Sequence, residues 1–246
     1  MLLAGALAPL VPARAGQPAP ATIAPNGKAG DRVEGSGTVV EEPRDAAGFD
    51  RLIVQGPLKV IVRAADADRV VVRADDNVAP LIETRRLGAT LVVGVRAGAA
   101  FRTRTDVQVR LQARQLNGVV LRGPGEVRAD RIDADIFEAT LQGSGDIVVD
   151  SLRARTVAVS IAGNGDVRLK GTATTLGVVI DGSGDLHAAD LAAGQVAVRI
   201  RGSGDARVHA VDQLKVELDG SGDVRYRGTP TISKSIRGTG TVTALR

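Results

Sequence analysis

The chain has 246 residues, of which 43% are apolar, so it is long enough to bury a sizeable core. Its 32 basic residues are nearly balanced by 28 acidic ones, which leaves a net charge of +4, and it has no cysteine. The lack of cysteine excludes disulfides and thiolate chemistry, and charges scattered along the sequence argue against a nucleic-acid-binding groove.

Aromatic residues make up only 2% of the chain, whereas there are 30 glycines. Val, Ile, Leu and Ala supply nearly all of the apolar side chains. Branched aliphatic residues favour strands, and a core without bulky rings suits narrow, layered β-structure. The composition therefore favours an all-β protein.

The N-terminal segment has the features of a targeting signal. An apolar run from Leu2 to Val11 is followed by Pro12, and Ala13-x-Ala15 is an acceptable small-residue cleavage site. We therefore expect a secretory signal peptide over residues 1–15; a disordered tail is the alternative, because no Lys or Arg precedes the run. The run is too short to span a bilayer and no cysteine is present for lipid attachment, so we expect no transmembrane anchor. Residues 16–34, rich in Pro, Ala and Gly, are expected to form a flexible tether.

Alternation with a period of two begins after the tether and predicts short strands. They are rich in β-branched residues, are separated by Gly, Pro, Asp and Asn, and cover residues 38–41, 50–54, 58–62, 69–73, 90–95 and 105–111. Asp75, Asp76 and Asn77 are suitable helix caps, so a short helix is expected over 78–86. The last of these strands leads straight into a repeat.

Similar tetrapeptides recur from Gly123 to the C-terminus, and their first glycines are 20, 20, 19, 20, 18 and 18 residues apart. A fixed short period with a glycine corner is typical of a solenoid, in which each coil buries its apolar side by stacking on its neighbours. The tetrapeptides are Gly123-Pro124-Gly125-Glu126, Gly143-Ser144-Gly145-Asp146, Gly163-Asn164-Gly165-Asp166, Gly182-Ser183-Gly184-Asp185, Gly202-Ser203-Gly204-Asp205, Gly220-Ser221-Gly222-Asp223 and Gly238-Thr239-Gly240-Thr241.

Apolar residues align from coil to coil on both sides of these corners. Before one corner they are Val157, Val159 and Ile161, and the neighbouring coils have aliphatic residues at the same positions. Successive residues in a strand face opposite sides, so these columns point into the coil. We predict an all-β, single-domain parallel β-helix over residues 35–246, with coils of 18–20 residues and Gly-x-Gly-Asp corners. The general chirality of parallel crossovers makes it right-handed.

The last coil departs from this pattern. Lys234 stands where the neighbouring coils have Val or Leu. Terminal repeats usually abandon the consensus, so Lys234 indicates the cap of the solenoid.

The residue after each corner belongs to a row of like charges, Glu126, Asp146, Asp166, Asp185, Asp205 and Asp223. Two positions further along, on the same face, lie Arg128, Arg168, His187, Arg207 and Arg225. Stacked carboxylates repel one another unless something compensates. The structural interpretation is that each carboxylate accepts hydrogen bonds from corner amides while the arginine row neutralises its charge.

Two functional interpretations of the acidic row compete with the structural one. The first is a calcium ladder on Asp146, Asp166, Asp185, Asp205 and Asp223, because Gly-x-Gly-x-Asp resembles half of the repeat of calcium-binding β-rolls; here, however, the acidic corner occurs once per coil. The second is a polysaccharide-cleaving site. Catalysis needs carboxylates in different environments, and these repeat monotonously. We therefore expect no catalytic residues and no cofactor, with calcium as the alternative.

The remaining residues that could carry chemistry are isolated. His187 and His209 are the only histidines, they lie on different coils, and no nucleophile motif adjoins either, so we interpret both as solvated strand residues. Tyr226 is a lone tyrosine and makes no sugar-stacking platform.

The sequence resembles the bacterial GIN-domain proteins, described as putative auto-transporter adhesin heads. The resemblance is carried by residues 49–56 (FDRLIVQG), 60–62 (VIV) and 70–78 (VVVRADDNV), and by the Gly-Ser-Gly-Asp series. It covers about Gly35 to Arg246. It implies an exported, non-enzymatic β-helix at the cell envelope.

These observations favour an adhesin-like interaction module in the periplasm or on the surface of a bacterium. Its flat strand faces would present regular polar columns to an envelope protein or a glycan, and no nucleic-acid partner is expected. The alternative is a structural scaffold in which β-helices stack end to end, because terminal coils expose unpaired edges. A polysaccharide-active enzyme is the third hypothesis.

Overall fold

The structure, a computed structural model, describes residues 32–245. The signal peptide expected over 1–15 and most of the expected tether lie outside this range. The last residues of that tether form strand β1 (Val33–Glu34), which pairs with β8 (Phe101–Arg102). No helix in the described range is long and apolar enough to cross a membrane.

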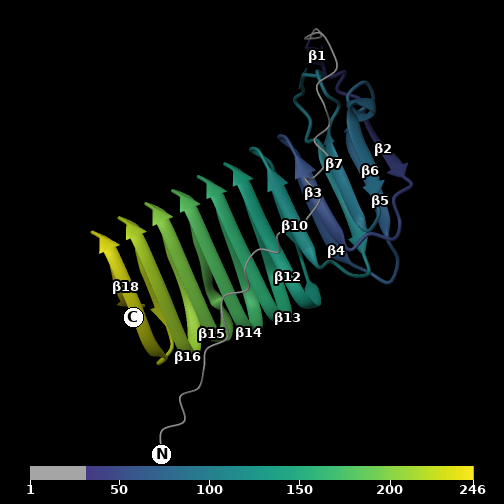
Figure 1. Cartoon of the computed structure of the whole chain (residues 1–246). Coiled ribbons are helices and arrows are strands. Elements are labelled where there is room, and N and C mark those ends of the chain that lie inside the picture. Colours follow the sequence, from purple (N-terminus) through teal and green to yellow (C-terminus); the bar gives the residue numbers. More distant parts are fainter. Residues whose placement is uncertain (1–31, 246) are drawn as a thin grey trace, which may run out of the picture.

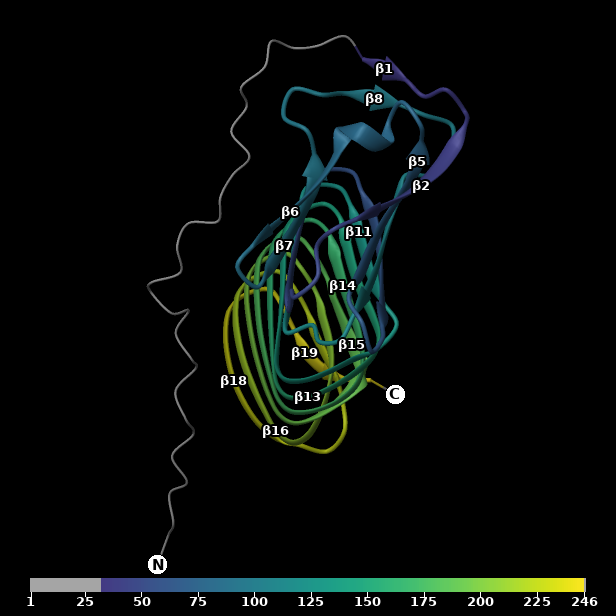
Figure 2. The same cartoon turned by 90° about the vertical axis from the view of Figure 1, so that its right-hand side faces the viewer.

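The predicted parallel β-helix is confirmed, and its coils stack along one axis (Figure 1). Two strand layers face each other across a flattened tube, which Figure 2 shows nearly end-on. We call the layer that precedes the glycine corners the pre-corner face and the layer that follows them the post-corner face. The repeat strands are β10 (Gly118–Arg122), β11 (Glu126–Ala129), β12 (Ile132–Gly143), β13 (Asp146–Gly163), β14 (Asp166–Gly182), β15 (Leu186–Gly202), β16 (Ala206–Gly220), β17 (Val224–Arg227), β18 (Thr231–Gly238) and β19 (Val242–Ala244).

The glycine corners hold all coils in one register. Gly143, Gly163, Gly182, Gly202, Gly220 and Gly238 are successive partners in the parallel ladders. The long strands β13 to β16 each run from one corner, around the second bend, to the next corner. Small register shifts at that second bend, such as the one between Val149 and Leu152, absorb the differences in coil length.

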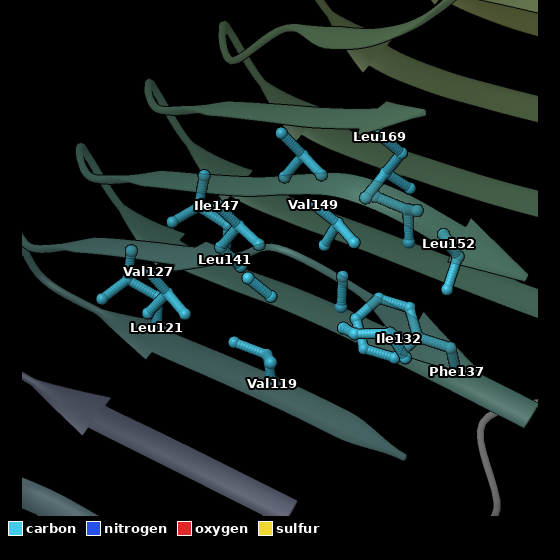
Figure 3. Close-up of a cluster of buried hydrophobic side chains, with 14 of the residues drawn as sticks. Val119, Leu121, Val127, Ile132, Phe137, Leu141, Ile147, Val149, Leu152 and Leu169 are labelled. Carbon is cyan, nitrogen blue, oxygen red and sulfur yellow. The ribbon is translucent and has the colours of Figure 1, made fainter. Parts of the chain in front are cut away.

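The core is a stack of aliphatic side chains between the two faces, as the alternating pattern predicts. Leu141, Ile161, Ile180, Ile200 and Leu218 form one such column, and none is more than 3% exposed. Figure 3 shows how Leu141 and its neighbours from both layers meet in the middle of the tube. Each buried Leu or Ile stabilises the fold by roughly 1.5–3 kcal/mol. The tube is too narrow for many rings, which accounts for the low aromatic content.

The N-terminal coils do not stack in chain order. Strand β3 (Arg51–Gln55) lies between β10 and β7 (Thr90–Val95), and β4 (Lys59–Ala64) lies between β11 and β9 (Gln108–Ala113). The later segment, β7 and β9, therefore forms the outermost coil. Along the chain β9 does lead straight into β10, as expected, but in space β3 and β4 lie between these two coils.

Antiparallel strands cover this N-terminal end. Strand β6 (Ile82–Leu87) pairs with β7, β5 (Arg69–Asp75) pairs with β9, and β2 (Val39–Arg44) pairs with β5. The helix expected over 78–86 is not formed beyond a single 3-10 turn, η1 (Ala79–Leu81). Pro80 can begin a helical turn. The residues of β6 that follow it satisfy their own backbone N–H and C=O groups by pairing with β7 instead of continuing the helix.

A buried carboxylate anchors the segment at the N-terminal tip. Asp75 is fully buried and accepts hydrogen bonds from the hydroxyls of Thr103, at 2.6 Å, and Thr105. These two hydroxyls hold the pKa of Asp75 below its ordinary value. A Cβ on Gly35 would lie 2.0 Å from Asp75 Oδ2, so only glycine lets the chain pass this close.

The C-terminal end is open. Every residue of β18 is exposed, and no described residue pairs with its outer edge. Lys234 is the ladder partner of Val216 and so takes an inward position in the last coil. The prediction that the last coil abandons the pattern is confirmed, but within residues 32–245 nothing covers it, and Ile232 and Ile236 are each 37% exposed.

The two glycines of a corner serve different purposes. Gly202 has φ of +127°, a conformation that side chains rarely adopt. Gly204 lies against the coil below, where an added Cβ would be 2.2 Å from the carbonyl oxygen of Gly184. The corner therefore requires glycine for its bend and for its close stacking.

We expect Gly204→Ala to lower the free energy of unfolding by about 1–3 kcal/mol, because the methyl group forces two backbones apart. Ser203→Ala, at the exposed residue between the glycines, is the matched control and should leave stability nearly unchanged. Urea denaturation followed by circular dichroism measures both. Equal stability of the two variants would show that the close approach is not a constraint.

Candidate functional site

The acidic row lies along the post-corner face, beside the glycine corners. The Oδ1 atoms of Asp185, Asp205 and Asp223 accept hydrogen bonds from the backbone N–H one coil further on, at 2.9, 2.9 and 3.0 Å. Asp146 makes the same contact with the N–H of Asp166, at 3.3 Å. The carboxylates therefore link one coil to the next at the point where the chain bends.

Arginines neutralise much of this row, as the structural interpretation predicts. Arg168 lies 2.6 Å from Asp166 and 3.7 Å from Asp146. Arg225 bridges Asp223 and Asp205 in the same way, at 3.2 and 3.8 Å. Each of these guanidinium groups is shared by carboxylates of two coils, so the stacked charges stabilise the register.

The pKa of Asp223 shows the effect of these contacts. The hydroxyl and the N–H of Thr241 both donate to its carboxylate, and Arg225 adds a favourable charge, so the pKa of Asp223 lies below its ordinary value. The charged form is therefore the one that the fold stabilises.

One group in the row has the composition of a metal site. Ligand atoms of Asp166, Asp185 and His187 lie within 4.8 Å of one another. Arg207 lies 2.9 Å from His187 Nδ1, and because arginine can only donate, Nδ1 must accept. In the neutral ring the proton then sits on Nε2, 3.6 Å from Asp166, and Nε2 has no lone pair to offer.

The same contacts bear on the calcium interpretation. Calcium takes six to eight oxygen ligands, largely from carboxylates, carbonyl groups and water. Here the Asp oxygens already accept backbone N–H groups, and Arg168 and Arg225 lie among them. At Asp146, Asp166, Asp205 and Asp223 a calcium ion would have to displace a guanidinium group.

The isolated histidines and the tyrosine stay apart in the structure. His187 is half-buried beside Arg207, and His209 lies on the next strand, β16, paired in register with Arg227. Tyr226 packs partly against the core. Neither histidine forms a hydrogen bond with a Ser, Thr or Tyr hydroxyl in the described part of the chain.

A hollow of about 550 Å³ opens at the second bend, near the N-terminal coils. Phe49, Asp50, Asp68 and Arg114 are among its lining residues. Asp68 accepts the N–H groups of Gly48 and Arg114 and serves to hold the turns together. Asp50 Oδ2 accepts a hydrogen bond from the side-chain amide of Asn117. Asp50 Oδ1 is buried and has no hydrogen-bond partner among the described residues.

A cluster of basic residues lies at the N-terminal end of the post-corner face, and sequence reasoning missed it. We call Lys59, Arg63, Arg69, Arg73 and Arg110 the basic patch; they come from β4, β5 and β9. The spacing of four between Lys59 and Arg63, and between Arg69 and Arg73, is a signal that each pair shares a strand face. The order of the strands along the chain does not show that these three strands lie next to one another.

Comparison with known proteins agrees with the fold. A family model described as "Putative auto-transporter adhesin, head GIN domain" matches residues 48–230. Among curated protein sequences, none matches the chain.

Crystal structures from Bacteroides and Parabacteroides have the same fold. A "putative adhesin" from Bacteroides fragilis is 24% identical and superposes with a TM-score of 0.83 over 87% of this chain and 100% of that one. A "putative lipid binding protein" from Parabacteroides distasonis is 22% identical, with a TM-score of 0.72 and the same coverage. A "putative adhesin" from Parabacteroides distasonis is 25% identical, with a TM-score of 0.69 and again the same coverage.

We expect Asp223→Asn to lower the melting temperature more at pH 7 than at about pH 2. The folded-state pKa of Asp223 is depressed, so its stabilising contribution is present above the unfolded pKa of about 3.9 and is lost as pH falls through the folded value. Asp219→Asn is the matched control, because Asp219 has no hydrogen-bond partner among the described residues. If Asp223→Asn lowered the melting temperature equally at both pH values, the stabilising role of the Asp223 charge would be contradicted.

Proposed function

Because a family model covers most of it, the chain belongs to the auto-transporter adhesin head GIN-domain family, and from that premise we propose an exported, adhesin-like module that acts by binding at the bacterial periplasm or cell surface. Its partner is an envelope protein or a glycan. Family membership supports adhesion and a non-enzymatic role at a coarse level. The location and the kind of partner are our proposal.

The observation that carries this proposal is the regularity of the two strand faces. Along the post-corner face two contacts recur. An N–H of the next coil donates to Asp146, Asp185, Asp205 and Asp223. An arginine lies beside Asp146, Asp166, Asp205 and Asp223. Catalysis requires groups held in contrasting environments. A long face of repeated polar columns instead suits binding to an extended partner at several points.

Export is supported by the apolar run from Leu2 to Val11 and by Ala13-x-Ala15. We expect the mature protein in the envelope fraction of the native bacterium, with its N-terminus at Gly16. Cell fractionation with N-terminal sequencing measures both. Ala15→Asp is the matched variant and should block processing, because signal peptidases require a small residue there. A full-length chain found only in the cytoplasm would contradict the proposal.

A stacking scaffold is the second candidate, and the open C-terminal end favours it. Strand β18 offers an unpaired edge, and Ile232 and Ile236 are partly exposed. Lys234 works against stacking, because an inward-pointing charge at an edge must be buried when a second copy docks. We therefore rank the scaffold below the binding module.

This ranking predicts that the natural protein is monomeric over a wide range of concentration, while Lys234→Val associates through β18. Light scattering after size-exclusion chromatography measures the mass of both. Lys215→Val removes the same charge on the outward side of β16 and should remain monomeric. Association of the natural protein would instead favour the scaffold. A Lys234→Val variant that stays monomeric would show that Lys234 does not prevent association.

A further inference from the structure

Three adjacent strands carry the basic patch. Strand β9 lies between β5 and β4, antiparallel to the first and parallel to the second. The residues that alternate with the patch are buried, for example Val72, Val109 and Val60. The patch residues therefore point outward. Read across the strands, the nine outward positions are Arg73, Gln108 and Lys59, then Val71, Arg110 and Ile61, then Arg69, Gln112 and Arg63.

None of these nine outward positions is acidic. On neighbouring strands no two of the cationic residues stand directly opposite each other. Arg63 and Arg69 lie on either side of Gln112, two strand spacings of about 4.8 Å apart. Further along the same face, Arg168 and Arg225 each lie beside carboxylates of two coils, and only part of the basic patch has such compensation.

Glu41 on β2 and Glu126 on β11 flank the patch and neutralise part of it. Glu41 lies 2.8 Å from Arg110 and 3.8 Å from Arg73, and Glu126 lies 3.6 Å from Lys59. Arg63 and Arg69 have no ion-pair partner in residues 32–245. They are the outward neighbours of Gln112 on either side.

A carboxylate also follows β11, the strand beside β4, but no ion pair joins it to Arg63 within residues 32–245. Asp130 follows Ala129 of β11 and accepts the backbone N–H groups of Ala64 and Arg131. Arg63 and Arg69 therefore leave positive charge exposed on either side of a glutamine. Each guanidinium presents a fork of donors that matches a carboxylate or a sulfate.

A hollow of about 460 Å³ lies over this part of the sheet. Its lining includes Arg63, Arg69, Arg110, Gln108 and Gln112. Ile61 and Val71 supply an apolar portion, and Glu41 lies at the rim. The glutamine amides can donate to hydroxyl groups and accept from them, while the arginines supply charge.

We propose that the hollow over β4, β9 and β5 binds an anionic polysaccharide, a linear glycan with carboxylate or sulfate groups. This proposal rests on the proposed function as a binding module and names its ligand class. The amides between the arginines suit a ligand that alternates hydroxyl and acidic groups. The hollow is lined by residues of all three strands, so a long chain that lies in it crosses them.

The same nine positions disfavour the other anionic partners. None is aromatic, so a nucleic acid would find no platform for base stacking. None is a large exposed hydrophobic residue, so a membrane would receive no inserting side chain.

The test measures binding of the whole mature protein to polygalacturonate and to dextran sulfate, with uncharged dextran as the reference. Arg63→Gln/Arg69→Gln is compared with Arg168→Gln/Arg225→Gln, which removes the same two charges from the acid-paired row of the same face. We expect the first variant to lose affinity by about tenfold or more and the second by less than about twofold. Arg63→Lys/Arg69→Lys, which keeps the charge but not the fork, should fall between them.

Arg63 and Arg69 are exposed, so the melting temperature of their double variant should match that of the natural protein. An equal loss of affinity in the two Gln variants, or equal binding to dextran, would overturn the proposal. Tighter binding to phosphatidylglycerol vesicles or to single-stranded DNA than to either acidic glycan would also overturn it. If neither glycan binds although the protein is processed and found in the envelope, the ligand class is wrong and the proposed function stands.

Discussion

The close stacking of glycine corners is the constraint on which the structure depends. In successive coils the second corner glycine lies so near the backbone below that an added Cβ would be 2.0 Å from an oxygen at Gly165, 2.4 Å at Gly184 and 2.2 Å at Gly204. Such contacts permit one register only. Because side chains alternate with a period of two, that register fixes which residues fill the tube and which face water.

A fixed register also places identical side chains on top of one another, and this has opposite results inside and outside. Inside the tube, Leu141, Ile161 and Ile180 stack on one another and form a continuous buried aliphatic column. Outside, carboxylate stacks on carboxylate, and the fold compensates with N–H donors from the next coil and with Arg168 and Arg225. Compensated charge of this kind stabilises the fold. The basic patch, where Arg63 and Arg69 have no such partner in the described range, is therefore a part of the face whose charge folding does not explain.

The repeat could be predicted from the sequence because its information is local. The tetrapeptide spacing and the aliphatic alternation predicted the coils, the core columns and the carboxylate contacts. The N-terminal order could not be predicted, because β9 inserts between β4 and β5 after a long excursion, and no local pattern encodes that choice. The helix expected over 78–86 failed for a similar reason, since pairing with β7 outweighs the caps at Asp75, Asp76 and Asn77. Basic residues that look scattered in the sequence converge only once these pairings are known.

The two ends of the solenoid differ in a way that bears on how it works. At the N-terminal end, β5 and β6 pair antiparallel with the outermost coil. Strand β2 pairs with β5 at the edge, where Pro43 removes a backbone donor. At the other end β18 is bare, yet Lys234 replaces the aliphatic residue that a docking copy would need there. Both ends thus oppose extension of the sheet by another chain. With its ends unsuited to stacking, the protein has its long side faces left for recognition, and on the post-corner face Arg63 and Arg69 line a hollow without an ion-pair partner in residues 32–245.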